Sequence, residues 1–217
     1  MKKRIYRYDS ETIEVSFDLA RCIHAQECIR GLPAVFDRGR RPWIDASADS
    51  ADAVARVIER CPSGALTYVR KDGGTPEVPS DNLVEVSPNG PLYVRGDIEI
   101  ADADDNVLLE CTRVALCRCG ASANKPLCDG SHERIGFADS GQLGTGGVKD
   151  VDPTADGRLR VKVRAGASLR FTGNFTVCGA GGTDERRGTN AALCRCGASM
   201  NKPFCDSSHK ELGDWEG

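Results

Sequence analysis

The sequence predicts an α+β protein in which a small α+β domain precedes a β-rich module built from an internal duplication. Runs rich in β-forming residues flank a segment at 50–60 whose apolar residues recur at helical spacing. A sixteen-residue cysteine motif at 117–132 returns almost letter for letter at 194–209, 77 positions later. Short alternating apolar runs precede both copies at the same distance, which is typical of strands.

Composition and length exclude several classes of function. A chain of 217 residues can fold as one or two domains with cores of their own. A net charge of −3 gives no overall attraction to nucleic acid or to an anionic membrane. The chain contains no apolar stretch of roughly 18 residues that could span a membrane and no apolar signal-peptide core at its start. We therefore expect a cytoplasmic protein without nucleic-acid or membrane partners, in which eleven cysteines serve as ligands more readily than as disulfides.

The first third of the chain has the pattern of a small α+β domain. Ser50 or Asp49 can cap the start of the predicted helix. The helix should end at Cys61, because a residue that precedes a proline is disfavoured in the α region. The predicted elements are strands at 4–8, 13–17 and 66–69 and a helix at 50–60.

Two segments of turn-forming residues predict the domain organisation. Residues 71–82 carry no apolar period and mark a boundary. Residues 133–158 are rich in Gly, Asp and Ser and predict a link between the two repeats. The glycine-rich part of this link, 141–147, lacks the Gly-Lys-Ser/Thr ending of a phosphate loop, so we expect a flexible linker. The expected domains are 1–75, 83–135 and 155–212.

Cys22, Cys28 and Cys61 form the first candidate metal site. Their spacing resembles single-cluster bacterial ferredoxins, in which a tight cysteine loop and a distant Cys-Pro hold one cubane-type cluster. The middle cysteine of that loop is replaced here by Ala25. The resemblance implies a divergent ferredoxin-like domain with a 3Fe-4S cluster, or a 4Fe-4S cluster with a non-cysteine fourth ligand, for which His24 is the candidate. The alternative is that these cysteines are buried hydrophobic residues.

Each copy of the repeated motif supplies three thiols and one imidazole. An extended backbone can point Cys117 and Cys119 at one metal, and Gly120 then lets the chain turn away. The i to i+4 spacing of Cys128 and His132 predicts one helical turn with both side chains on one face. A closed Cys3His zinc site is the alternative, although zinc modules usually place two to four residues between paired cysteines. The candidate ligands are Cys117, Cys119, Cys128 and His132 in the first copy and Cys194, Cys196, Cys205 and His209 in the second.

Both copies resemble the CDGSH iron–sulfur family, whose pattern is Cys-x-Cys-x2-Ser/Thr-x3-Pro-x-Cys-Asp-Gly-Ser/Ala/Thr-His. The first copy matches every defined position, and the second departs from the pattern only at Ser207, where the family has glycine. The resemblance implies one 2Fe-2S cluster per motif, with two cysteines on the inner iron and a cysteine and a histidine on the outer iron. Members with one motif form homodimers with interlocked strands, so the resemblance implies a monomer in which 83–209 is an intramolecular pseudo-dimer.

The predicted function is electron transfer to or from an unidentified oxidoreductase, by a carrier and not an enzyme. Two observations favour electron transfer. The chain has three predicted centres of two chemical types, and it has no recognisable substrate motif. A neutral imidazole ligand raises the potential and can couple reduction to proton uptake. The alternative is a cluster donor to an apo-acceptor protein, or a redox or iron sensor; an enzyme with substrate at an open iron ranks last. Cys111 and Cys178 are not equivalent in the repeat, and we expect both to be buried small residues.

Overall fold

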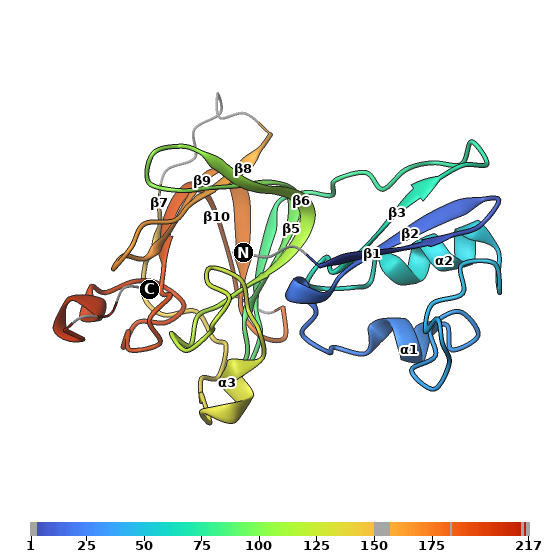
Figure 1. Ribbon diagram of the computed structural model, residues 1–217. Coiled ribbons are helices and arrows are strands. Elements are labelled where there is room, and N and C mark those ends of the chain that lie inside the picture. The colour runs from blue at the N-terminus through green and yellow to red at the C-terminus, as the bar shows by residue number, and fades with distance from the viewer. Residues whose placement is uncertain (1–3, 150–156, 183, 214, 216–217) are drawn as a thin grey trace. The chain divides into compact units, whose positions relative to one another are not determined.

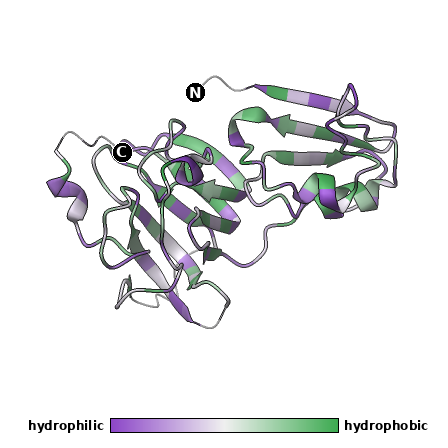
Figure 2. Ribbon diagram, turned by 90° about the horizontal axis from the view of Figure 1, so that it is seen from below, coloured by the Kyte–Doolittle hydropathy of each residue, from purple (hydrophilic) through white to green (hydrophobic). Residues whose placement is uncertain are grey.

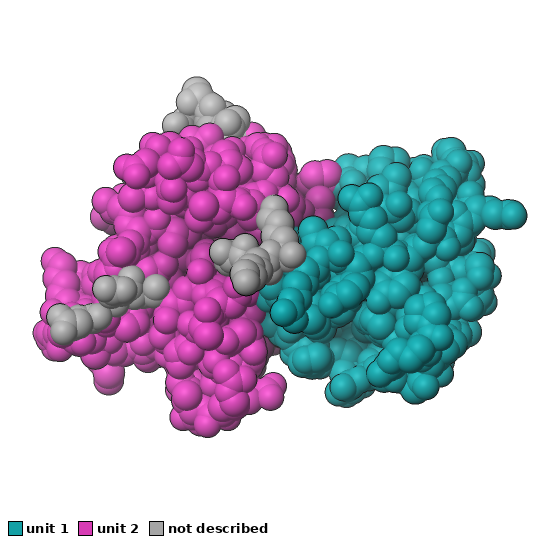
Figure 3. Space-filling model, in the orientation of Figure 1, with its two compact units in different colours: residues 1–78 teal, residues 79–217 magenta. Residues whose placement is uncertain are grey.

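The computed structural model describes residues 4–149, 157–182, 184–213 and 215, and the chain divides into two compact units, Met1–Val78 and Pro79–Gly217 (Figures 1 and 3). The division lies within the turn-rich segment 71–82. Both units are rich in strands and contain few helices, and hydrophobic residues gather on the strands of both (Figure 2). No helix in the described part of the chain is long and apolar enough to cross a membrane.

The first unit is a three-stranded antiparallel sheet with helices. Its hydrophobic core lies where the buried face of the main helix, including Val54 and Ile58, packs with Ile13 and Val15 of the middle strand. Ser50 caps that helix, because its hydroxyl accepts a hydrogen bond from the Ala53 amide at 3.3 Å. The elements are β1 (Ile5–Asp9), β2 (Ile13–Asp18), η1 (Leu19–Arg21), α1 (Glu27–Gly31), α2 (Ala51–Ile58) and β3 (Leu66–Arg70), with sheet order β1-β2-β3.

The short helix α1 was not expected from the sequence. It contains no buried residue, so it carries no apolar stripe from which a helical period could be recognised. The helix begins after Gln26, which has a left-handed backbone with φ of 65°. Its contribution is to place Cys28 in the first turn, beside the loop that carries Cys22.

The second unit is a seven-stranded sheet made from two copies of the same three-strand pattern. The first copy consists of β4 (Leu83–Val86), β5 (Leu92–Ala101) and β6 (Val107–Leu116). The second copy consists of β8 (Leu159–Lys162), β9 (Leu169–Cys178) and β10 (Glu185–Leu193). Three short elements complete the unit: α3 (Ser131–Arg134), β7 (Val148–Lys149) and η2 (Ser208–Glu211).

The two copies interlock through their first strands. Strand β4 pairs antiparallel with β5 of its own copy and parallel with β9 of the other, so Val84 lies opposite both Val94 and Val177. Strand β8 mirrors this arrangement, because it pairs antiparallel with β9 and parallel with β5. Side chains of both copies, such as Ile98 and Phe171, form one buried core. The strand exchange that family members with one motif make between two chains therefore occurs here between the two copies within one chain.

The glycine-rich segment 141–147 is not the flexible linker that its composition predicts. The Gly144 amide donates to the Lys202 carbonyl at 2.9 Å, and the Thr145 amide donates to the Asn201 side chain at 2.7 Å. The segment leads into β7, which pairs with β10. Gly147 has φ of 97° and approaches the Phe204 ring so closely that a Cβ would collide with it. Glycine at position 147 lets the backbone pack closely against the Phe204 ring of the second motif. Composition alone cannot distinguish this role from chain flexibility.

Candidate metal centres

The candidate ligands of the two repeated motifs lie directly after the last strand of each copy. Cys117 follows β6, and its amide donates to the Pro126 carbonyl at 2.9 Å. The Cys128 amide donates to the Ala115 carbonyl at 2.9 Å, so the returning chain is held against the strand end. The corresponding bonds of Cys194 and Cys205 repeat this pattern. The sheet therefore brings the two halves of each motif together.

Each motif presents two pairs of donor atoms. The Sγ atoms of Cys117 and Cys119 are 3.6 Å apart, and the Cys128 Sγ is 3.4 Å from the Nδ1 of His132. In the second copy, the distance from Cys194 Sγ to Cys196 Sγ is 3.7 Å, and that from Cys205 Sγ to His209 Nδ1 is 3.5 Å. Two ligands that bind one tetrahedral metal at about 2.3 Å stand about 3.7 Å apart. All four pairs have the spacing of ligands to a tetrahedral metal.

The two pairs of the first motif also lie near each other. Burial is the main cause that raises the pKa of the Cys128 thiol to about 11, and the nearby Cys117 adds to the rise. The thiol of Cys119, followed by the amide of Ser122, lowers the pKa of Cys117 to about 6. Burial lowers the pKa of His132, which favours the neutral ring that metal ligation requires. Within the described residues, no three Cys, His, Asp or Glu side chains converge on a single ion position.

A buried serine holds the loop between the paired cysteines and the third cysteine. The Ser122 hydroxyl donates to the Leu127 carbonyl at 2.7 Å and accepts from the Asn124 amide at 3.0 Å. Ser199 makes the same two bonds in the second copy, at 2.7 and 3.0 Å. The serine at this motif position is therefore part of the scaffold that shapes the loop.

The helical turn expected to carry Cys128 and His132 begins later than predicted. Helix α3 starts at Ser131, so Cys128 lies outside it (Figure 1). Gly130 takes a left-handed conformation with φ of 81°, and its amide donates to the Cys128 sulfur at 3.4 Å. Asp129 accepts a hydrogen bond from the Ser131 amide at 2.9 Å. A tight turn, and not a helix face, therefore brings the thiol and the imidazole together.

Ser207 keeps the same turn in the second copy although it is not glycine. Its φ is 76°, and its amide donates to the Cys205 sulfur at 3.4 Å. A residue with a Cβ in this region carries a strain of about 1–2 kcal/mol. We expect Ser207→Gly to raise the stability of the second motif by about 1 kcal/mol and Gly130→Ser to lower that of the first by a similar amount. Denaturant midpoints measure both changes, and a lower midpoint for Ser207→Gly would contradict the prediction.

The two motifs contact each other through the glycines that follow their paired cysteines. A Cβ placed on Gly120 would lie 2.4 Å from the Cys196 carbonyl oxygen. A Cβ placed on Gly197 would lie 2.7 Å from the Cys119 carbonyl oxygen. The contact is reciprocal, and both glycines have positive φ, 81° and 83°. The backbone after the paired cysteines of one motif therefore packs directly against the corresponding backbone of the other motif.

The arginine between the paired cysteines is the main feature of the site that sequence reasoning missed. Arg118 is 1% exposed and Arg195 is 2% exposed. Each guanidinium lies over an aromatic ring, Phe137 at 5.1 Å and Trp215 at 5.4 Å. The signal was present in the sequence, because Cys-Arg-Cys is identical in both copies. A long charged side chain between two metal-ligand candidates is normally expected at the surface, so the sequence pattern does not indicate its burial.

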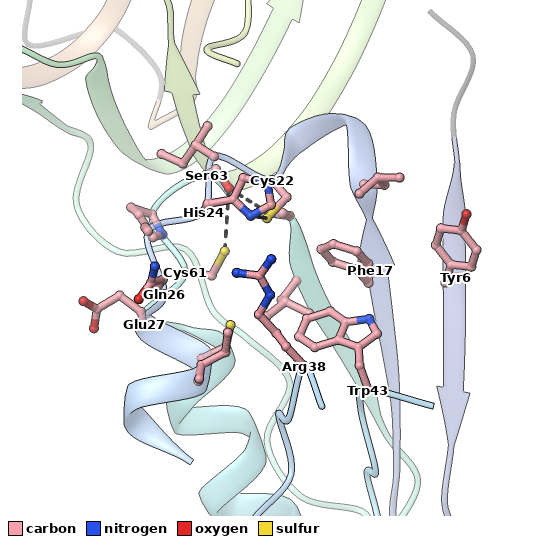
Figure 4. A pocket seen from close by; sticks show the side chains of 18 of the residues that line it. Tyr6, Phe17, Cys22, His24, Gln26, Glu27, Arg38, Trp43, Cys61 and Ser63 are labelled. Atoms are coloured by element: carbon pink, nitrogen blue, oxygen red, sulfur yellow. Dashed lines mark hydrogen bonds between the residues drawn. The ribbon is translucent and has the colours of Figure 1, made fainter. Parts of the chain in front are cut away.

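The three cysteines of the first unit line one cavity of about 460 Å³ (Figure 4). Burial, followed by the neighbouring Cys61, raises the pKa of Cys28 to about 11. Burial also raises the pKa of Cys22, and Arg38 on the cavity wall partly opposes that rise. The structure therefore brings together the three thiols that the spacing singled out. The donor set fits a cluster held by three thiolates.

His24 lies at the same cavity. Its Nδ1 is 3.9 Å from the Cys22 Sγ, the contact drawn as a dashed line in Figure 4. The residue has a left-handed backbone with φ of 57°, which turns its ring back toward the cysteine that precedes it. The separation is longer than the two Cys–His distances of the repeated motifs. At this distance from the Cys22 sulfur, His24 remains a candidate for the fourth ligand of the first centre.

Comparison with known proteins separates the first unit from the two repeated motifs in the same way. A family model described as "Iron-binding zinc finger CDGSH type" matches residues 89–133 and 166–210. A second, described as "Divergent 4Fe-4S mono-cluster", matches residues 8–71. The two repeats are iron-binding CDGSH domains. They follow a divergent mono-cluster domain.

Relatives of this CDGSH protein are found in Escherichia coli. Two proteins named "Uncharacterized protein YjdI", from strain K12 and from O157:H7, are each 42% identical over 64 residues. The match covers 30% of this chain and 84% of each relative. No solved structure matches the chain.

Proposed function

We propose that this CDGSH protein is an electron carrier with two Cys3His 2Fe-2S clusters and one 3Fe-4S or 4Fe-4S cluster, which exchanges electrons with a redox partner protein. The observation that carries the proposal is the arrangement of donors in each motif, two pairs at the spacing of a tetrahedral metal. In a 2Fe-2S cluster each iron takes two protein ligands. Such clusters supply one-electron chemistry at potentials set by ligands and hydrogen bonds.

The protein's own groups would favour reduction at these sites. Backbone amides donate to sulfur atoms in both motifs, as Gly130 does to Cys128 and Ala198 does to Cys196, each at 3.4 Å. Such hydrogen bonds stabilise negative charge on sulfur and raise the potential. The Nδ1 of His132 faces Cys128, and its Nε2 faces outward, 4.0 Å from Glu133. The outward nitrogen is the position at which a proton would be taken up on reduction.

A donor of clusters to an apo-acceptor protein, or a redox or iron sensor, is the second candidate function. The observation that favours it is the exposure of the outer pair. Both outer donors of the second motif, Cys205 and His209, are half-buried, whereas only one of its inner donors, Cys196, is half-buried and the other, Cys194, is 2% exposed. An outer iron held by more accessible donors is easier to release to an acceptor. Rapid transfer of iron and sulfide to an apo-ferredoxin, faster than reduction and reoxidation by an artificial donor and acceptor, would favour this function over electron transfer.

Metal and acid-labile sulfide analysis under anaerobic conditions, with EPR of the oxidised and reduced protein, tests the proposal. We expect about seven or eight irons per chain, the sum for two 2Fe-2S clusters and one larger cluster. A signal in the oxidised protein would select 3Fe-4S at the Cys22 site. Zinc in place of iron would overturn the proposal. Sedimentation should show a monomer, because the strand exchange is satisfied within one chain.

Replacing Cys61 tests the first centre separately. We expect Cys61→Ser to remove about three or four irons per chain and to leave the EPR signals of both 2Fe-2S centres unchanged. The reason is that the cores of the two units share no residue. Cys111→Ser is the matched control, because Cys111 is half-buried and outside all three ligand sets. Full iron content in Cys61→Ser would remove Cys61 from the ligand set.

A further inference from the structure

A groove of about 460 Å³ lies on the second unit, beside the second motif. Two cations line it, Lys149 of β7 and Arg170 of β9, and both residues are exposed. Cys205, a candidate ligand of the second centre, lines the groove as well. None of the described residues that line it is acidic. Its volume lies within the range of small-molecule pockets, about 300–1,000 Å³.

The strand register places both cations on one face of the sheet. Lys149 pairs with Asn190 of β10. Arg170 pairs with Ala192, which lies two residues further along the same strand. Directly opposed residues share a face of a sheet, as do alternate residues of one strand, so all four lie on the same face. Ala191, between the two β10 positions, is 2% exposed and belongs to the core, so the face with the cations is the outer one.

The two cations are close enough to bind one ligand together. Strand β10 lies between β9 and β7, and neighbouring strands are about 4.8 Å apart. The backbones of β9 and β7 are therefore about 10 Å apart, short enough for two long side chains to bind one group between them. The Cys205 amide donates to the Ala192 carbonyl at 2.9 Å, so this ligand of the second centre is held at the same strand. A group bound by Lys149 and Arg170 would therefore lie beside the second centre.

The glycine-rich segment 141–147 fixes the side of the groove that carries Lys149. It leads directly into β7 and is bound to the second motif by the Gly144 and Thr145 amides. Arg186 of β10 also donates to the Gly144 carbonyl. Lys149 therefore starts from an ordered strand, which lowers the entropy cost of binding a ligand.

The first copy lacks the arginine at the corresponding position. The 77-residue offset of the repeat places Tyr93 where the second copy has Arg170, and Tyr93 is half-buried. The position of Asn190 is occupied by Arg113, which is only 3% exposed. The exposed pair of cations is therefore a feature of the second copy, although the ligand motifs of the two copies are nearly identical.

We propose that this groove binds a phosphate group, either free phosphate or the phosphate of a small molecule, through Lys149 and Arg170. A guanidinium binds phosphate by two parallel N–H···O bonds, and a lysine ammonium binds it as a point charge. A phosphate monoester carries about −1.5 to −2 charges at pH 7, which matches two cations better than a singly charged carboxylate does. This site goes beyond the proposed electron transfer and does not depend on which metal the motif holds.

The test is isothermal titration calorimetry of the full-length protein with inorganic phosphate, glucose 6-phosphate and glucose. We expect saturable binding of a phosphate probe that is at least about tenfold weaker in Arg170→Gln and in Lys149→Gln, because each variant loses a charged hydrogen bond. Arg170→Lys, which keeps the charge, should bind more tightly than Arg170→Gln. Arg187→Gln is the matched control, because it removes an exposed positive charge from β10 outside the groove and should bind as the wild type does.

The order of affinities identifies the source of the phosphate. Tighter binding of glucose 6-phosphate than of inorganic phosphate assigns the groove to a phosphorylated small molecule, and the reverse order assigns it to free phosphate. Failure of both phosphate probes to bind, or equally tight binding of glucose, would overturn the proposal. Unchanged affinity in Arg170→Gln and Lys149→Gln would also overturn it, as would equal weakening in Arg187→Gln. Zinc in place of iron in the same samples would overturn the proposed function and leave this inference intact.

Discussion

Replacement of Gly120 by alanine is expected to remove iron from both CDGSH motifs, although the substitution lies in only one of them. The added Cβ would lie 2.4 Å from the Cys196 carbonyl oxygen. This steric clash can be relieved only if the backbone of one of the two segments moves. Cys196 is a candidate ligand of the second centre, so the movement would displace its thiol as well as that of Cys119. We expect a loss of up to about four irons per chain, the content of two 2Fe-2S clusters.

Gly130→Ala is the matched control for this prediction. Gly130 has the same φ as Gly120, 81°, so the strain of placing an alanine there, about 1–2 kcal/mol, is the same. A Cβ on Gly130 meets no atom within 4 Å. The difference in iron and sulfide content between the two variants therefore isolates the contact between the motifs. Equal retention of iron in both variants, or a loss from the first motif alone in Gly120→Ala, would contradict the prediction.

The second large effect is expected for His132→Cys in mildly acidic buffer. Ligation requires an unprotonated ring nitrogen, and an ordinary imidazole takes up its proton as the pH falls through about 6.5. Burial lowers the pKa of His132, so protonation of this ring needs a lower pH than that. Acid should therefore release the histidine and then the cluster in both motifs of the wild-type protein. With His132→Cys, the first centre loses its acid-labile imidazole, and about half of the 2Fe-2S absorbance should persist through the acid treatment.

The variant His209→Cys should protect the other half, and the double variant should protect both. His24→Ala tests the third histidine. Because His24 lies in the first unit and outside both CDGSH motifs, this variant should leave the acid-labile absorbance of the two 2Fe-2S centres as in wild type, whatever it does to the first centre. The measurement is the decay of visible absorbance after a drop in pH. Equal decay in wild type and His132→Cys would show that the imidazole is not the acid-labile ligand.

The donor pairs of the two motifs were predictable because they depend on short spacings. Cys117 and Cys119 are two residues apart, and Cys128 and His132 are four apart, so local backbone geometry alone brings each pair within reach. The resemblance to the CDGSH family rests on these spacings and is confirmed by the family match over both motifs. The predicted strands and the helix at 50–60 were also close to the observed elements, because their apolar periods are local.

Other features were decided only by tertiary structure. The segment 141–147 has the composition of a linker, and its contacts with Asn201 and Phe204 come from residues more than fifty positions away. The register that places Lys149 and Arg170 on one face of the sheet likewise joins strands that are distant in the chain. Sequence alone determined which side chains form the donor pairs of each motif, since the two members of a pair are close neighbours in the chain. Folding determined how the two motifs influence each other, since that depends on which distant groups the interlocked strands bring into contact.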